Sequence, residues 1–319
     1  MRIIFFGSPD FALPSLRALL AAGYDVVAVI SQPDRPAGRG HAATPPPVKR
    51  VAVEQGLTVL QPEKLSAPES VEALSALDSD VFIVAAYGQI LRQRLLDVPK
   101  RGILNVHASL LPRWRGASPV AASILAGDQV TGVTLMEMVR ALDAGSMVAR
   151  AEVEISPHDT TGTLEPRLAE AGAALLAESL EAWDAGRLFA EPQDESQVTY
   201  APQLARSDAL LDWSLPAVDL WRRVRAFNPW PVAHTHWRGE ELRIHEAWPL
   251  THDSGDVPGT VLASAPLPPE ASDPQETFAV ATGDGALAVR RLQRPGKRAL
   301  SGAEFLRGQR GFVGERLGD

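Results

Sequence analysis

The chain contains no cysteine among its 319 residues. This absence excludes disulfide bonds, thiolate nucleophiles and cysteine-ligated metal sites, and it fits the reducing cytoplasm. The sequence also lacks any apolar run close to the ~20 residues that a membrane-spanning helix needs. The apolar run at residues 1–6 is too short for the core of a signal peptide. We therefore expect a soluble, cytoplasmic protein with no membrane partner.

An excess of positive charge is also absent. Lysine and arginine total 31 against 39 aspartate and glutamate residues, which gives a net charge of -8 at pH 7. This balance excludes a uniformly basic nucleic-acid surface but not a local basic patch. Residues 290–319 carry such a patch. Their acidic residues are Glu304, Glu315 and Asp319, and their more numerous basic residues are Arg290, Arg291, Arg294, Lys297, Arg298, Arg307, Arg310 and Arg316. The patch suits contacts to an RNA backbone, or it is a solvated rim.

Short apolar segments alternate with helical patterns in the first half of the chain. This alternation is typical of a mostly parallel, Rossmann-like sheet in an α/β domain. The predicted strands are 3–6, 26–30, 58–60, 81–86 and 103–106, and the predicted helices are 12–22, 47–55 and 71–77. Two further strands, at 130–136 and 147–155, and a helix at 163–183 complete this part.

The periodic pattern is lost over residues 189–207, which have the composition of a linker. We therefore predict a catalytic domain at 1–188, a linker at 189–207 and a second domain at 208–319. In the second domain we expect a helix at 217–226 and short strands at 234–237, 241–247, 260–262, 278–282 and 287–292, with a flexible loop at 250–276. Such short, evenly spaced strands predict a small OB-like β-barrel.

Polar groups crowd the segment 105–116, directly after an apolar strand. Because side chains alternate along a strand, Asn105 and His107 lie on one face and can converge on one substrate atom. Pro112 and Gly116 stop the strand, which places these groups at the carboxyl edge of a parallel sheet. Open α/β sheets bind their ligands at that edge. The segment is therefore the candidate active site.

Asp143, in the turn 142–145, is the candidate partner of His107. A carboxylate beside an imidazole favours its charged form and fixes its tautomer. Each residue also has a plainer interpretation, because histidine and asparagine end many strands and aspartate is common in turns. The residues alone leave these roles open.

Three other segments attract attention. Residues 7–10 lack the glycine spacing of a dinucleotide site, and we expect an ordinary strand-to-helix turn capped by Ser8. Residues 35–41 form a Gly/Pro-rich loop with Arg35 and Arg39, which either grips phosphates or is simply solvated. The Pro- and Trp-rich segment 227–231 is expected to form a rigid packed corner.

Four motifs together resemble the methionyl-tRNA formyltransferase family. They are NVHASLLPRWRG at 105–116, SQPDRPAGRG at 31–40, AAYGQIL at 85–91 and VRAFNPWP at 224–231. The Asn, His and Asp set is shared with other folate-dependent formyltransferases, which act on glycinamide ribonucleotide or on sugar nucleotides. The loop at 35–40 and the second domain are what the resemblance ties to tRNA.

The resemblance implies that 10-formyltetrahydrofolate donates a formyl group to the α-amino group of methionyl-initiator tRNA. It implies no metal, and we expect a monomer. The implied site residues are Asn105, His107 and Asp143 for catalysis; Gln89, Ile90, Leu91, Ser109, Leu110, Leu111 and Pro112 for the folate; and Arg35, Arg39, Arg294, Lys297 and Arg298 for the tRNA. Amine attack builds negative charge on the formyl oxygen, which Asn105 and a protonated His107 can stabilise.

The family continues with lysines after Gly40, whereas this chain has His41, Ala42 and Ala43, so that Arg39 is the main cation at the loop tip. Two alternatives stay open at this point. One is a formyltransferase for a sugar nucleotide. The other is a non-catalytic RNA-binding protein built on the same fold.

Overall fold

The computed structural model describes residues 1–37, 42–252, 255–263, 271 and 277–318. The chain divides into two compact units. The first comprises Met1–Pro119, Gln129–Glu154 and Leu164–Pro202, and the second comprises Val120–Asp128, Ile155–Thr163 and Gln203–Asp319. The predicted boundaries at 188 and 208 stay a prediction.

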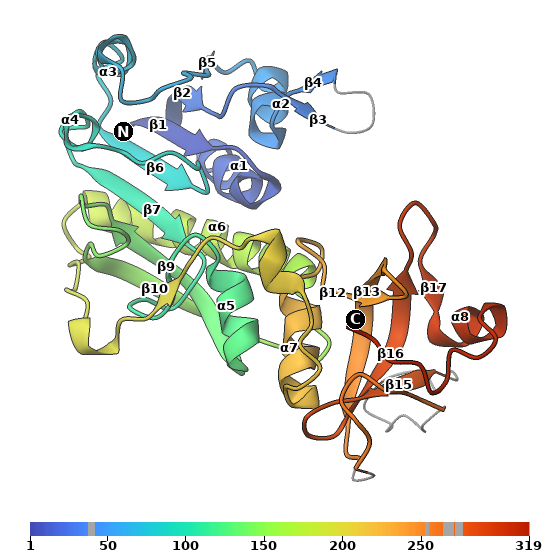
Figure 1. Cartoon of the computed structure of the whole chain (residues 1–319). Helices are drawn as coiled ribbons and strands as arrows, with labels where there is room; N and C mark the ends of the chain where they lie inside the picture. The colour runs from blue at the N-terminus through green and yellow to red at the C-terminus, as the bar shows by residue number, and fades with distance from the viewer. Residues whose placement is uncertain (38–41, 253–254, 264–270, 272–276, 319) are drawn as a thin grey trace. The chain divides into compact units, whose positions relative to one another are not determined.

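A seven-stranded sheet in the order β10-β9-β7-β6-β1-β2-β5 forms the centre of the first unit (Figure 1). Its strands are β1 (Arg2–Gly7), β2 (Asp25–Ile30), β5 (Val59–Leu60), β6 (Val81–Ala85), β7 (Ile103–His107), β9 (Val130–Glu137) and β10 (Met147–Glu154). The strands from β5 to β7 pair in parallel, whereas β9 and β10 are antiparallel. This mixed sheet confirms the predicted fold class.

The central strands are apolar along their whole length. Every residue of β6 and β7 is buried, as is all of β1 after its first residue. Such continuous burial is expected where helices cover both faces of a parallel sheet. The helices of this part of the chain are α1 (Leu13–Ala21), α2 (Pro47–Glu54), α3 (Pro68–Ser75), α4 (Gln93–Leu96) and α6 (Thr161–Asp184). Pro14 and Pro47 lie in first turns, as predicted, since proline is tolerated there.

One local expectation needs correction, and one helix has no counterpart among the predicted elements. Ser8 does not cap a helix, because its hydroxyl donates to the Tyr87 carbonyl at 3.5 Å and accepts the Gln32 N–H at 3.0 Å. The sequence also gave no sign of α5 (Pro119–Ala126), which is apolar on nearly every side and so shows no helical period.

The predicted protruding loop begins and ends in a hairpin, β3 (Arg35–Ala37) and β4 (Ala42–Thr44). Its tip, with the predicted tRNA-binding residue Arg39, lies outside the described residues. At the base of the hairpin, Asp34 pairs with Lys49 at 2.8 Å and accepts a hydrogen bond from Gln61. The Lys49 ammonium holds the pKa of the Asp34 carboxyl below its ordinary value. These contacts connect the base of the hairpin to Lys49 and Gln61.

Residues 189–202, predicted as the start of a linker, belong to the first unit. The short strand β11 (Tyr200–Ala201) pairs in parallel with β8 (Arg115–Gly116), the end of the candidate site segment. Gln193 is buried nearby. This stretch lacks periodicity because it is held by individual contacts rather than by one apolar face.

The second unit contains an antiparallel sheet that forms a half-barrel, in the order β12-β13-β16-β15-β14, with β17 on β16. Its elements are α7 (Ala217–Ala226), β12 (His234–Trp237), β13 (Glu240–Leu250), β14 (Val261–Leu262), β15 (Phe278–Ala281), β16 (Ala286–Gln293), β17 (Leu300–Ser301) and α8 (Gly302–Gly308). Four rings, of Trp237, Phe278, Phe305 and Phe312, pack edge-on or tilted in its core. Much of the predicted loop at 250–276 lies outside the described residues.

The helix α8 was not among the predicted elements, although the sequence carries its capping box. Ser301 accepts the backbone N–H of Glu304, and the Glu304 carboxylate accepts that of Ser301. Among the described residues, no helix combines the length and apolar character needed to cross a membrane.

One glycine allows α6 to lie close against the sheet. A Cβ added at Gly172 would lie 2.6 Å from Val106 Cγ1 and 3.2 Å from Val133 Cγ1. Both valines belong to strands at the centre of the site, β7 and β9. The close approach of this helix therefore helps to fix the strand that carries Asn105 and His107.

We expect Gly172→Ala to lower the free energy of unfolding by about 1–2 kcal/mol. Overpacking costs ~1–3 kcal/mol, which outweighs a gain in helix propensity of up to ~1 kcal/mol. Urea denaturation measures the difference. The control is Gly308→Ala in α8, where an added Cβ meets nothing within 4 Å, so this variant should be as stable as the wild type or slightly more so. Equal stability of the Gly172→Ala protein would contradict the packing argument.

Candidate active site

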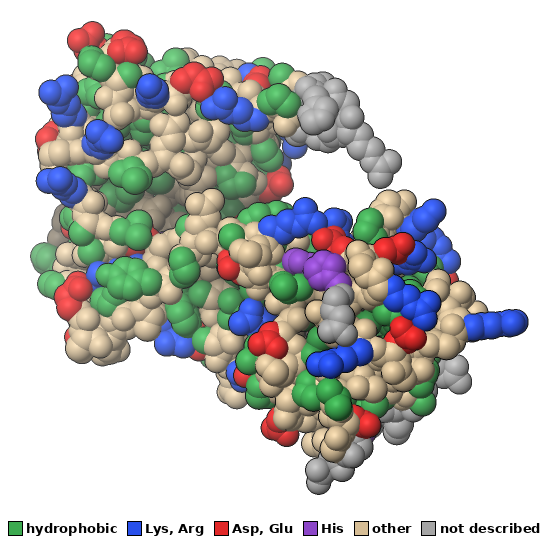
Figure 2. Space-filling view, in the orientation of Figure 1, with side chains coloured by type: hydrophobic (Ala, Val, Ile, Leu, Met, Phe, Trp, Pro, Cys, Tyr) green, Lys and Arg blue, Asp and Glu red, His purple; other side chains and the backbone are tan. Residues whose placement is uncertain are grey.

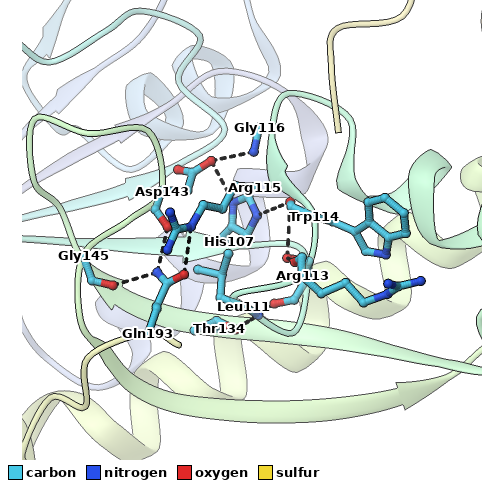
Figure 3. Close-up of polar contacts among 11 residues, drawn as sticks. His107, Leu111, Arg113, Trp114, Arg115, Gly116, Thr134, Asp143, Gly145 and Gln193 are labelled. Atoms are coloured by element: carbon cyan, nitrogen blue, oxygen red, sulfur yellow. Dashed lines mark hydrogen bonds and ion pairs between the residues drawn. The ribbon is translucent and has the colours of Figure 1, made fainter. Parts of the chain in front are cut away.

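The loop that follows β7, residues 108–114, is fixed in shape by hydrogen bonds (Figure 3). The Thr134 hydroxyl on β9 donates to the Ser109 carbonyl at 2.7 Å and accepts the Leu111 N–H at 3.1 Å. The Ser109 hydroxyl donates to the Arg113 carbonyl at 2.7 Å. The loop therefore holds its polar groups in place before any substrate arrives.

His107 ends β7 and is buried, with only 6% of its surface exposed. Its Nε2 lies 3.0 Å from the Trp114 carbonyl oxygen. Because a carbonyl only accepts hydrogen bonds, Nε2 carries a hydrogen. The other nitrogen, Nδ1, lies 3.7 Å from Asp143 Oδ2. Nδ1 is thus the ring nitrogen that faces the carboxylate.

Asp143 is held in a turn with a positive φ of 47°. Its Oδ2 accepts the Gly116 backbone N–H at 2.8 Å and faces His107 (Figure 3). The structure therefore brings together His107 and Asp143, which are well separated in sequence. The carboxylate is oriented to stabilise a charged imidazole.

Asn105 precedes His107 by two residues on β7 and is also buried. Strand alternation places both side chains on one face of the sheet. Within the part of the chain that the structure describes, the Asn105 side-chain amide has no hydrogen-bond partner. It is therefore available to a substrate oxygen.

Gln193 and Arg115 belong to the same constellation, although the sequence analysis assigned neither a role. The Gln193 amide donates to the carbonyls of Asp143 and Gly145, at 2.7 and 2.8 Å. Arg115 Nε donates to Gln193 Oε1 at 2.9 Å. No periodicity or motif links position 193 to position 143, so only the fold reveals the contact.

The residues predicted to bind folate lie in two neighbouring loops. Residues 86–91 follow β6 and residues 108–114 follow β7, and these strands are parallel, so both loops leave the same edge of the sheet. Ile90 is 82% exposed, whereas Leu91 and Leu111 are buried in apolar clusters. Gln89 accepts the Leu65 N–H at 3.0 Å. Contact with folate stays a prediction for all of these residues and for Leu110 and Pro112.

The cations predicted to bind tRNA are mostly paired with carboxylates. Arg35 lies 2.8 Å from Glu63 in the first unit. In the second unit, Arg294 pairs with Glu240, and Arg298 lies 2.9 Å from Glu304. Lys297, between these two arginines, is exposed. In Figure 2, basic and acidic side chains are interspersed on the visible face of this unit.

The residues that the structure describes include no group of three or more His, Asp or Glu side chains placed to hold a metal ion.

Comparison with known proteins shows where this arrangement belongs. Residues 1–180 match the formyl transferase family, and residues 203–310 match the formyl transferase C-terminal domain. The methionyl-tRNA formyltransferase of Methylococcus capsulatus is 49% identical over 318 residues and covers 100% of both chains. The Bacillus subtilis methionyl-tRNA formyltransferase is 46% identical and covers 99% of this chain and 98% of its own.

Among solved structures, the sugar 3N-formyl transferase WlaRD superposes with a TM-score of 0.65 at 15% identity, over 93% of this chain and 99% of its own. HypX from Aquifex aeolicus superposes with a TM-score of 0.60 at 21% identity, over 98% of this chain and 49% of its own. These two likenesses concern the fold alone. The near-half identity to the two bacterial relatives, over full length, is decisive: the chain belongs to the methionyl-tRNA formyltransferase family.

Proposed function

We propose that the chain transfers the formyl group of 10-formyltetrahydrofolate to the α-amino group of methionyl-initiator tRNA, giving N-formylmethionyl-tRNA. The observation that carries this proposal is the pairing of His107 with Asp143 at the carboxyl end of β7, in a chain that matches formyltransferases over its full length. We further propose that the protein acts in the cytoplasm as a monomer and uses no metal. A single sedimenting species of about 34 kDa would support the monomer.

The reaction requires charge stabilisation and a proton transfer. The amine nitrogen attacks the formyl carbon and forms the new C–N bond, which places negative charge on the formyl oxygen. The Asn105 amide donates to that oxygen, together with the Nδ1–H of a protonated His107. When the bond from the formyl carbon to folate N10 breaks, the carbonyl re-forms.

The amine must lose a proton and folate N10 must gain one. His107 Nδ1 and the Asp143 carboxylate lie 3.7 Å apart, so a proton carried on Nδ1 stays next to a stabilising charge. Exchange between Nδ1 and the reacting nitrogens, directly or through a water, balances the reaction. Because Nε2–H is engaged by the Trp114 carbonyl, the ring does not need to turn during the cycle.

We propose that the loops 86–91 and 108–114 hold the folate and that Arg35, Arg39, Arg294, Lys297 and Arg298 contact the tRNA backbone. The first assay is incubation with both substrates, release of the amino acid and measurement of its mass. Added formyl on methionine supports the proposal. Its absence with intact protein and tRNA would refute it.

Removal of either the His107 imidazole or the Asp143 carboxylate should slow turnover without unfolding the chain. We expect His107→Ala and Asp143→Ala to reduce kcat by about 10²–10⁴-fold, the usual contribution of acid–base assistance. Single-turnover formylation measures the loss, and circular dichroism checks the fold. The matched control is Asp97→Ala, because Asp97 is exposed and bonds only Gln93 among its described neighbours. Turnover close to wild type in either site variant would remove that residue from the mechanism.

Neutralising Lys297, an exposed cation of the second unit, should weaken the use of tRNA without affecting the use of folate. We expect Lys297→Ala to raise the KM for tRNA, to leave the KM for folate unchanged and to reduce the salt slope of tRNA binding by about 1. Arg187→Ala is the control, since Arg187 is an exposed, paired arginine of the first unit outside the predicted tRNA contacts. An unchanged KM for tRNA in the Lys297 variant would contradict the assignment.

A further inference from the structure

We propose that Gln193 is a positioning residue for the formyl transfer: its side-chain amide holds the turn 142–145, called the Asp143 turn below, so that the carboxylate stays against His107. This inference rests on the proposed function. It assigns a role in the reaction to a residue from a segment whose sequence suggests only a linker.

The first observation is that one amide group bonds two backbone carbonyls of the Asp143 turn. Gln193 Nε2 donates to the Asp143 carbonyl at 2.7 Å and to the Gly145 carbonyl at 2.8 Å (Figure 3). An amide NH₂ has two hydrogens, so both contacts are made at once and its donor capacity is used up. The side chain is only 9% exposed, so the contacts face little competition from water.

The second observation is that Gln193 is itself held in one orientation. Arg115 Nε donates to Gln193 Oε1 at 2.9 Å, which fixes the amide so that its nitrogen faces the turn. Arg115 is 3% exposed, and its terminal nitrogens lie 2.7 and 3.3 Å from the Glu195 carboxylate oxygens. A buried guanidinium needs such a partner, because an unpaired buried charge is costly. The chain of contacts therefore runs from Glu195 through Arg115 and Gln193 to the Asp143 turn.

The third observation is that the Asp143 turn needs to be held. Asp143 has a φ of 47°, in the left-handed region that residues with a side chain rarely adopt. Gly145 approaches β9 so closely that an added Cβ would lie 1.7 Å from the Glu137 carbonyl oxygen. Among the described residues, the Asp143 side chain accepts one backbone hydrogen bond, from the Gly116 N–H. Releasing the backbone would let the carboxylate tilt away from His107.

The test uses an exchange that changes the donor and almost nothing else. Gln193→Glu keeps the oxygen that Arg115 bonds but turns the donating nitrogen into an acceptor that faces two carbonyl oxygens. We expect kcat for formyl transfer to fall by about 10–100-fold, the size of effect that a misplacement near 1 Å produces. Both KM values should stay within about twofold, because Gln193 is buried and its amide is engaged by Asp143, Gly145 and Arg115.

The matched control is Gln197→Glu, the same exchange four residues later in the same segment. Gln197 is exposed and donates to the Asp194 carboxylate, away from the turn. Its kcat should equal that of the wild type. A kcat of Gln193→Glu equal to that of the control would overturn the proposal. If the glutamate variant does not fold, Gln193→Met, which removes the donor without adding charge, replaces it with the same expected loss.

A positioning role differs from a general structural role in its dependence on Asp143. In an Asp143→Asn background, Gln193→Glu should cause little further loss of kcat, because its effect acts through the carboxylate that is already gone. Two losses that multiply would show that Gln193 stabilises the fold generally, and would overturn the proposal.

A readout without activity separates this inference from the proposed function. In protein labelled with ¹⁵N-glycine, the Gly116 amide hydrogen should exchange faster in Gln193→Glu than in the wild type, since its acceptor is Asp143 Oδ2. Unchanged exchange would overturn the inference even if formylation is observed. Faster exchange in a protein that formylates no methionyl-tRNA would support the contact and refute the function.

Discussion

Burial of β1, β6 and β7 on both faces is the constraint on which the rest of the structure depends. A layer this apolar accepts polar side chains only where partners or substrates meet them. Asn105 and His107 lie in the last three residues of β7, where the strand gives way to a loop whose carbonyls and amides supply those partners. The candidate site therefore lies at the end of the strand, where its polar side chains can find hydrogen-bond partners that the apolar interior of the sheet does not supply. Gly172 extends the constraint to α6, whose close approach to Val106 and Val133 leaves the strands little freedom to shift.

Much of this arrangement was predictable from the sequence, because its signals are local. Alternating apolar runs predicted the strands, and the spacing of Asn105 and His107 predicted a shared face. The failures have physical causes. The helix at 119–126 is apolar on nearly every side and so has no period, and Ser8 bonds to other loops instead of capping. The contact between Gln193 and Asp143 could not be predicted, because the two residues are 50 positions apart and glutamine is common in linkers. Local patterns report elements, whereas contacts between loops depend on the finished fold.

Several of the basic residues predicted to bind tRNA form ion pairs within the protein. Arg35, Arg294 and Arg298 each pair with a glutamate, so the proposed contacts to tRNA phosphates require the exchange of a carboxylate that is already in place. Exposed pairs of this kind contribute only about 0–1 kcal/mol, which keeps the exchange easy. The proposed contacts predict that tRNA affinity is the sum of several weak exchanges and is sensitive to ionic strength.

The pairing of β11 with β8 limits where this protein can be divided into separate parts. The stretch through Pro202 adds a strand to the site segment and supplies the amide that holds the Asp143 turn. A boundary drawn where the helical pattern ends, near residue 188, would separate Gln193 and β11 from the turn and the strand that they bond. Any chimera that joins the first unit to a different second unit must therefore carry the chain to residue 202, since the connecting peptide folds as part of the unit that precedes it.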